Sequence, residues 1–107
     1  KSEEAYEARD KAMAALFLIE RISREQIRNL SVLDLNLEEE EIRLSFKKEF
    51  RHIKKETLWS LRNYLRGRTR LNPITDWVFV NKKGIKIAES SFKGFIRKLK
   101  RLRCEVI

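Results

Sequence analysis

The sequence is poor in the residues that cross-link or interrupt a small fold. Its single cysteine, Cys104, excludes an internal disulfide bond and leaves zinc without a set of cysteine ligands. One proline and three glycines among 107 residues leave few breaks in regular structure. A chain of this length buries one core rather than two. We therefore expect one mostly regular domain that holds no metal ion and no other cofactor.

The sequence also lacks a long apolar run. The longest run, from Ala12 to Ile19, is far shorter than the roughly 20 residues that a helix needs to span a bilayer. No signal-peptide pattern, with a basic start, an apolar stretch and a small-residue cleavage site, precedes it. These features predict a protein that is not inserted in a membrane and that is located in the cytoplasm.

Charges of opposite sign are distributed unevenly along the chain. Residues 1–42 contain six Lys or Arg and eleven Asp or Glu, a net charge of −5, whereas residues 43–107 contain nineteen and five, a net charge of +14. A concentrated positive field suits a polyanion, because each phosphate that Lys or Arg neutralises releases condensed counterions. Charged residues that merely solvate the surface are the simpler explanation. We favour a nucleic acid as the partner.

Apolar spacing predicts several helices. Alanine and leucine recur at helical intervals from Glu3 to Glu20, which predicts a long first helix. Ser23 and Gln26 form a capping-box pattern, so a second helix is expected from Arg24 to Leu30. A third helix is expected around residues 58–65, ending at Gly67. The last helix is expected to be capped by Ser90 or Ser91, and its apolar side comprises Phe92, Phe95, Ile96, Leu99 and Leu102.

Alternating apolar residues predict a small sheet between the second and third helices. The alternation covers residues 33–37, 42–46 and 50–54, with a polar turn at 47–49 between the last two strands. Residues 77–80 have the composition of a short buried strand. The predicted fold class is thus α+β, a mostly helical domain with a three-stranded antiparallel sheet.

The stretch from Arg9 to Leu30 resembles the start of the catalytic domain of the tyrosine recombinases, the phage integrase family. Residues 9–12 match the family pattern R-D-x-A, and Ile27, Leu30 and Asp34 match the residues that follow the family's T-G-x-R motif. Residues 42–48, 57–65 and 77–91 resemble the segments that come next in the family. The resemblance implies that residues 1–107 form a single integrase-like domain, the amino-terminal half of the catalytic domain and incomplete relative to it.

The resemblance also indicates where the chain departs from the family's chemistry. In the family, arginines and a histidine or lysine clamp the scissile phosphate while a tyrosine attacks it. Counted without gaps from both flanks, the first arginine position falls on Ser23; a register shifted by two residues would place Arg21 there. Lys47, in the hairpin turn, corresponds to the lysine that protonates the leaving 5′ oxygen. Arg21 and Lys47 are therefore the candidate catalytic residues.

Complete strand transfer is not expected from these residues alone. The family's H-x-x-R motif and its nucleophilic tyrosine would lie beyond Leu102. Tyr6 precedes the first matched helix, and Tyr64 lies on the side of a helix that is expected to face the core, so neither can replace the nucleophile. Whether the chain is a fragment of an active recombinase or a degenerate relative stays open, although Ser23 favours a degenerate relative.

Two groups of basic residues are candidates for contacts with duplex DNA. One group lies in the hairpin and the other recurs at helical spacing on the last helix, opposite its apolar side. The candidates are Lys47, Lys48, Arg51, Lys93, Arg97 and Lys100. Of the other residues with distinctive chemistry, His52 is expected to have a structural or solvent-facing role, and Trp59 and Trp77 to lie in the core or at its rim.

These observations predict a DNA-binding, integrase-like domain that takes part in DNA integration or recombination and is not catalytic on its own. The alternative is a protein-interaction or assembly module whose basic face binds an acidic partner. Besides duplex DNA, a protein partner or a homo-oligomer on DNA is a possible further partner. Salt dependence distinguishes the two functions, because contacts with several phosphates make DNA binding steeply sensitive to ionic strength.

Overall fold

The computed structural model describes residues 2–44, 49–71 and 73–106. Within these residues, four α-helices, three short strands and two 3₁₀ turns follow one another. They are α1 (Ser2–Leu18), α2 (Arg24–Arg28), a turn at Val32–Asp34, β1 (Leu35–Asn36), β2 (Glu41–Arg43), β3 (Phe50–His52), α3 (Lys55–Arg68), a turn at Thr69–Leu71 and α4 (Glu89–Val106). The strands form an antiparallel sheet in the order β1-β2-β3. The predicted fold class is confirmed. No helix in these described segments is both long and apolar enough to cross a membrane.

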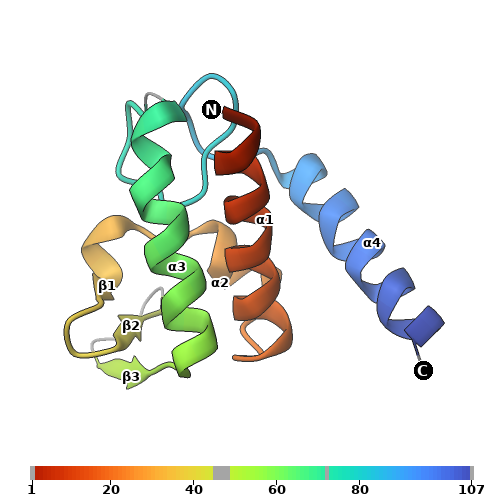
Figure 1. Ribbon diagram of the computed structural model, residues 1–107, viewed down its shortest axis with the longest axis horizontal. Helices are drawn as coiled ribbons and strands as arrows, with labels where there is room; N and C mark the ends of the chain where they lie inside the picture. Colours follow the sequence, from red (N-terminus) through yellow and green to blue (C-terminus); the bar gives the residue numbers. More distant parts are fainter. Residues whose placement is uncertain (1, 45–48, 72, 107) are drawn as a thin grey trace.

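Helices α1 and α3 pack side by side, the sheet lies near one end of this pair, and α4 extends away from the body (Figure 1). Small residues let the two helices approach closely, since a methyl group built on Gly67 would lie 3.6 Å from the Cβ of Ala5. The prediction that α3 ends at Gly67 is wrong, because the helix continues to Arg68 and into the following 3₁₀ turn. Gly67 lies within the helix, where α1 packs against it.

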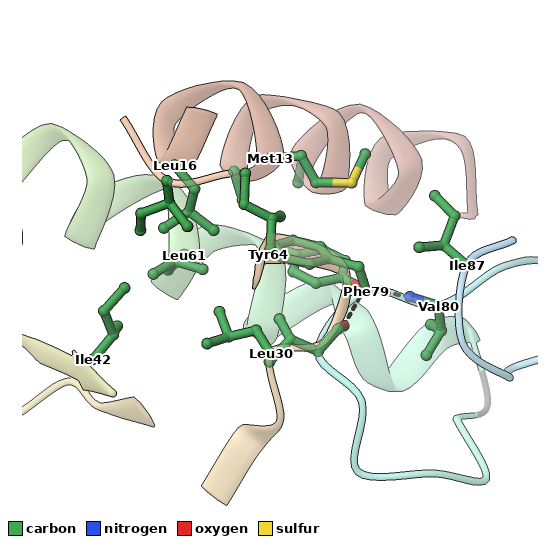
Figure 2. Close-up of a cluster of buried hydrophobic side chains, with 14 of the residues drawn as sticks. Met13, Leu16, Leu30, Ile42, Leu61, Tyr64, Phe79, Val80 and Ile87 are labelled. Atoms are coloured by element: carbon green, nitrogen blue, oxygen red, sulfur yellow. Dashed lines mark hydrogen bonds between the residues drawn. The ribbon is translucent and has the colours of Figure 1, made fainter. Parts of the chain in front are cut away.

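The core lies between α1, α3 and the segment 77–80 (Figure 2). Tyr64 is fully buried, and its ring stacks on Phe79 with the centroids 5.4 Å apart. The Tyr64 hydroxyl donates a hydrogen bond to the carbonyl oxygen of Val78 (2.7 Å) and accepts one from the backbone N–H of Val80 (3.4 Å). Burial raises the pKa of Tyr64. The expected core position of this tyrosine is confirmed, and its hydroxyl is not accessible to a substrate.

The predicted strands at residues 33–37 and 77–80 are wrong in part. Val32–Asp34 is a 3₁₀ turn because the Ser31 hydroxyl accepts a hydrogen bond from the N–H of Leu33 (3.2 Å) and the Asp34 carboxylate accepts one from the N–H of Ser31 (3.1 Å). Only two residues of the predicted strand 33–37 pair with β2. Residues 77–80 are buried at positions 78–80, as expected, but they form isolated bridges, Ser31 with Trp77 and Val80 with Lys86, instead of a strand.

The last helix begins earlier than expected. Because α4 starts at Glu89, Ser90 and Ser91 lie in its first turn and do not cap it. Its apolar side is confirmed as far as the side chains are described: Phe92 and Ile96 are buried, and Phe95 and Leu99 pack against the core while partly exposed. This packing turns the opposite, basic side of the helix outward.

The two tryptophans differ in environment. Trp77 is partly buried at the rim of the core, with the Lys86 ammonium nitrogen 4.0 Å from its ring centroid. Trp59 is 66% exposed, so its predicted position in the core or at the core rim is wrong. It occupies the outer side of α3, whereas Leu58 and Leu61 fill the core on the inner side. His52 is exposed, and its Nε2 atom lies 3.7 Å from a carboxylate oxygen of Glu41.

Candidate nucleic-acid interface

Helix α2 and the start of α4 are held together by polar bonds as well as by apolar contacts. The Arg28 guanidinium donates a hydrogen bond to the carbonyl oxygen of Ile87 (2.8 Å), just before α4 begins. The Lys86 ammonium donates to the side-chain oxygen of Asn29. Desolvation lowers the pKa of Lys86, and the neighbouring charge of Arg28 lowers it further. These bonds fix the first turns of α4 beside α2.

A groove runs between the two helices, and we call it the α2–α4 groove. It consists of two hollows, of about 200 Å³ and 140 Å³, which share Arg24 and Lys93 in their walls. The first is also lined by Glu25, Arg28, Asn29, Glu89 and Phe92. The second is lined in addition by Ile96, Arg97 and Lys100, so among the described residues its wall has four cations and no carboxylate. The lining of the second hollow is therefore more positive than that of the first.

The predicted DNA contacts on the last helix converge in this groove. Lys93, Arg97 and Lys100 are exposed on α4, and all three line the second hollow. Lys93 also lies 3.8 Å from Glu89, one turn earlier on the helix. Arg24 was not among the candidates on the hairpin and the last helix. The sequence indicates a phosphate contact there only through its position beside the start of α2, directly after the Ser23 cap.

Arg51, a predicted contact from the hairpin, has a partner within the protein. Its guanidinium donates to the backbone oxygen and to a carboxylate oxygen of Glu20, both at 3.2 Å. The other carboxylate oxygen of Glu20 accepts a hydrogen bond from the backbone N–H of Lys54 (2.9 Å). The Glu20 side chain is 3% exposed and that of Arg51 is 43% exposed. Arg51 thus connects β3 to the segment that follows α1, and it does not line the α2–α4 groove. Lys47 and Lys48 lie outside the described residues.

Comparisons with known proteins show the family and the fold of the chain. The sequence pattern of the phage integrase family matches residues 1–104. The chain belongs to the phage integrase family. The crystal structure of XerA recombinase is similar to it, with a TM-score of 0.77 and 22% sequence identity over 94% of this chain. The match covers 41% of XerA, so the chain spans less than half the length of that recombinase, and the likeness concerns the fold. A search of curated proteins found no match.

The residues before α2 bear on the two possible registers of the integrase motif. Ser23 is the N-cap of α2, in extended conformation. Arg21 has a φ angle of 58°, in the left-handed region that glycine adopts most readily. The T-G-x-R pattern places a glycine two residues before the arginine. The conformation of Arg21 therefore supports the register in which Ser23 occupies the arginine position.

In the described segments, no group of three or more His, Cys, Asp or Glu side chains is placed to hold a metal ion. Basic side chains from two helices predominate in the lining of the groove, and such side chains suit an anion.

Proposed function

We propose that this integrase-family chain binds duplex DNA through the α2–α4 groove. The observation that carries the proposal is the second hollow, where cations from two helices surround a surface without a carboxylate among the described lining residues. Arg24, Lys93, Arg97 and Lys100 are all exposed, so they can reach successive phosphates of a duplex. The net charge of +14 on residues 43–107 adds long-range attraction.

We further infer that the 107 residues form one integrase-like domain, serve DNA integration or recombination, and do not complete strand transfer by themselves. Ser23 is uncharged, so at the position of the family's first arginine it cannot neutralise the charge that develops on a phosphate in the transition state. Tyr64 is buried and hydrogen-bonded to the backbone, which makes it unsuitable as a nucleophile. With a labelled duplex carrying a nicked, suicide-type cleavage site, we expect no covalent protein–DNA adduct on a denaturing gel.

The binding proposal is tested by a fluorescence-anisotropy titration of a labelled DNA duplex at several salt concentrations. Four phosphate contacts give a slope of log K against log salt of about −3.6, which is roughly a 100-fold loss of affinity between 50 and 200 mM salt. Replacing Lys93, Arg97 and Lys100 together by glutamine should reduce the magnitude of the slope by the contribution of about three phosphate contacts. It should weaken binding to duplexes of unrelated sequence by the same factor.

The matched control removes the same charge elsewhere. Lys11, Lys82 and Lys83 are exposed and do not line the α2–α4 groove. Their combined replacement by glutamine should leave most of the slope in place. If both triple variants lose affinity equally, the groove is not the interface. If the wild-type chain does not bind duplex at low salt, the DNA proposal fails, and a basic face for an acidic protein partner becomes the better account.

A further inference from the structure

The outer side of α3 carries basic residues around an exposed tryptophan. Lys55, Trp59, Arg62 and Arg66 are separated by four, three and four residues, so they line up along one side of the helix. All four are exposed, and Trp59 is 66% exposed. The buried residues of α3, which include Leu61 and Tyr64, lie on the opposite side. We call this row of four residues the α3 surface.

Packing against the core does not account for the exposed position of the Trp59 side chain. A tryptophan that packs at a core rim loses most of its exposed area, whereas this side chain keeps about two thirds of it. No ion pair in the described segments involves Lys55, Arg62 or Arg66, although one nitrogen of Arg62 donates a hydrogen bond to the backbone oxygen of Leu37 (3.0 Å). The positive charge beside the ring is therefore largely available to a ligand.

We propose that the α3 surface is a second nucleic-acid contact, which holds a single strand with an unpaired base stacked on Trp59. Lys55, Arg62 and Arg66 bind the backbone phosphates on either side of that base. An aromatic ring within a basic row is the usual combination for binding single strands without sequence preference. The row from Lys55 to Arg66 is about 16 Å long at 1.5 Å per residue, which accommodates a few nucleotides.

A strand of nucleic acid accounts for the surface better than a protein or a membrane does. A protein hot spot surrounds its tryptophan with a packed, water-excluding contact. On α3 itself, however, the remaining exposed residues are Glu56 and Asn63, which are charged and polar. A helix that lies on a membrane needs an apolar side turned to lipid, and the apolar side of α3 is buried against α1.

Neighbouring carboxylates limit the extent of the surface. Beyond Arg66, Arg70 is paired with Glu4 at 3.6 Å. On the side of Arg62, the turn that follows Leu37 contains Glu38 and Glu39, both exposed. These negative charges disfavour a long polyanion across this region. The contact is therefore short and centred on Trp59.

The α3 surface is separate from the α2–α4 groove. In Figure 1, α1 lies between α3 and α4, and α3 contributes no residue to the groove. A duplex in the groove and a strand on α3 would thus contact different parts of the chain. The two proposals can accordingly fail independently.

The test uses a fluorescein-labelled oligothymidylate, which forms no duplex, and measures anisotropy at low salt. Trp59→Ala should weaken its binding roughly 5- to 100-fold, the range expected for the loss of one stacked base. Trp59→Phe keeps an aromatic face and should retain most of the affinity. Because Trp59 is exposed, neither variant should change the unfolding transition, which circular dichroism checks.

Two further measurements complete the test. The combined replacement of Lys93, Arg97 and Lys100 by glutamine should reduce duplex binding while leaving oligothymidylate binding nearly unchanged. Oligothymidylate should also quench the tryptophan fluorescence of the wild type more than that of Trp59→Phe, in which Trp77 is the remaining tryptophan. The proposal is overturned if the wild type does not bind oligothymidylate, or if Trp59→Ala binds it as well as the wild type does. It is also overturned if oligothymidylate binding is lost in the Lys93, Arg97 and Lys100 triple variant and kept in Trp59→Ala.

Discussion

The Ser23 hydroxyl accepts a hydrogen bond from the backbone N–H of Gln26 at 3.2 Å, and the Gln26 side-chain oxygen accepts one from the backbone N–H of Ser23 at 3.4 Å. This reciprocal pair closes the first turn of α2. In the ungapped integrase register, Ser23 occupies the position of a catalytic arginine. The side chain at this position therefore stabilises the helix that carries Arg24, one of the groove's four cations.

Two substitutions of Ser23 distinguish its role as a helix cap from the effect of a positive charge at this position. Ser23→Ala should lower the free energy of unfolding by about 1 kcal/mol, because the N–H of Gln26 loses its acceptor. Ser23→Arg should lower it by a similar amount while strengthening duplex binding, since it adds a cation beside Arg24. Urea denaturation and duplex anisotropy measure the two effects. An arginine variant that binds duplex no better than the alanine variant would place residue 23 away from the DNA.

The strained backbone at Arg21 gives a second prediction. A non-glycine residue in the left-handed region costs about 1–2 kcal/mol, so Arg21→Gly should raise the free energy of unfolding by about 1 kcal/mol after the extra chain entropy of glycine is deducted. Arg21→Ala is the control, because it removes the side chain and keeps the strain. If Arg21 acts on a phosphate, as the shifted register requires, both variants should lose duplex affinity. In the register that we favour, both retain most of it.

Local patterns predicted the parts of this fold that depend on neighbouring residues. The capping box at Ser23 and Gln26 spans three residues, and the structure contains it. The apolar and basic sides of α4 follow from helical spacing alone. The predicted strand at 33–37 failed for an equally local reason, because Ser31 and Asp34 close a turn that alternation of apolar residues does not reveal.

Contacts between distant residues could not be predicted in this way. Glu20 and Arg51 are 31 residues apart, and nothing in either segment indicates that one neutralises the other. Arg24 lines the groove because α4 packs on α2, which depends on the whole core. Trp59 was predicted to lie in the core or at its rim, as tryptophans are highly buried on average, whereas the side of α3 that faces the core is already filled by leucines and Tyr64. Burial is a property of the assembled fold.

The pair of Glu20 and Arg51 gives a third prediction. Arg51→Gln should lower the free energy of unfolding by about 1 kcal/mol, the order expected for a half-exposed charged hydrogen bond, because Glu20 loses its ionic partner. It should leave the salt slope of duplex binding unchanged, since the guanidinium is engaged within the protein. Thermal unfolding and the anisotropy titration provide the two readouts. A slope reduced by about one contact, with unchanged stability, would instead support the sequence prediction that Arg51 binds DNA.

Tyr64 gives the last prediction, a loss of stability at alkaline pH. Burial raises the pKa of Tyr64 above its usual value of 10.0, so the unfolded chain releases the phenolic proton at a lower pH than the folded chain does. The stabilisation from the neutral, buried hydroxyl is therefore complete below pH 10.0 and is lost as the pH rises towards the folded-state pKa. Between the two values, this group lowers the free energy of unfolding by about 1.4 kcal/mol per pH unit.

Tyr64→Phe isolates this contribution. At neutral pH the variant should be less stable by about 1–3 kcal/mol, because the N–H of Val80 loses its acceptor. The oxygen of Val78 loses the Tyr64 donor and keeps the hydrogen bond from Arg68 Nε (3.1 Å). Above pH 10.0 the difference from the wild type should shrink, because the variant has no phenol to ionise at this position. Urea denaturation at a series of pH values measures both effects, with Tyr6→Phe as the control that should keep the wild-type slope. A slope that persists unchanged in Tyr64→Phe would assign the alkaline loss to other groups, because phenylalanine cannot ionise.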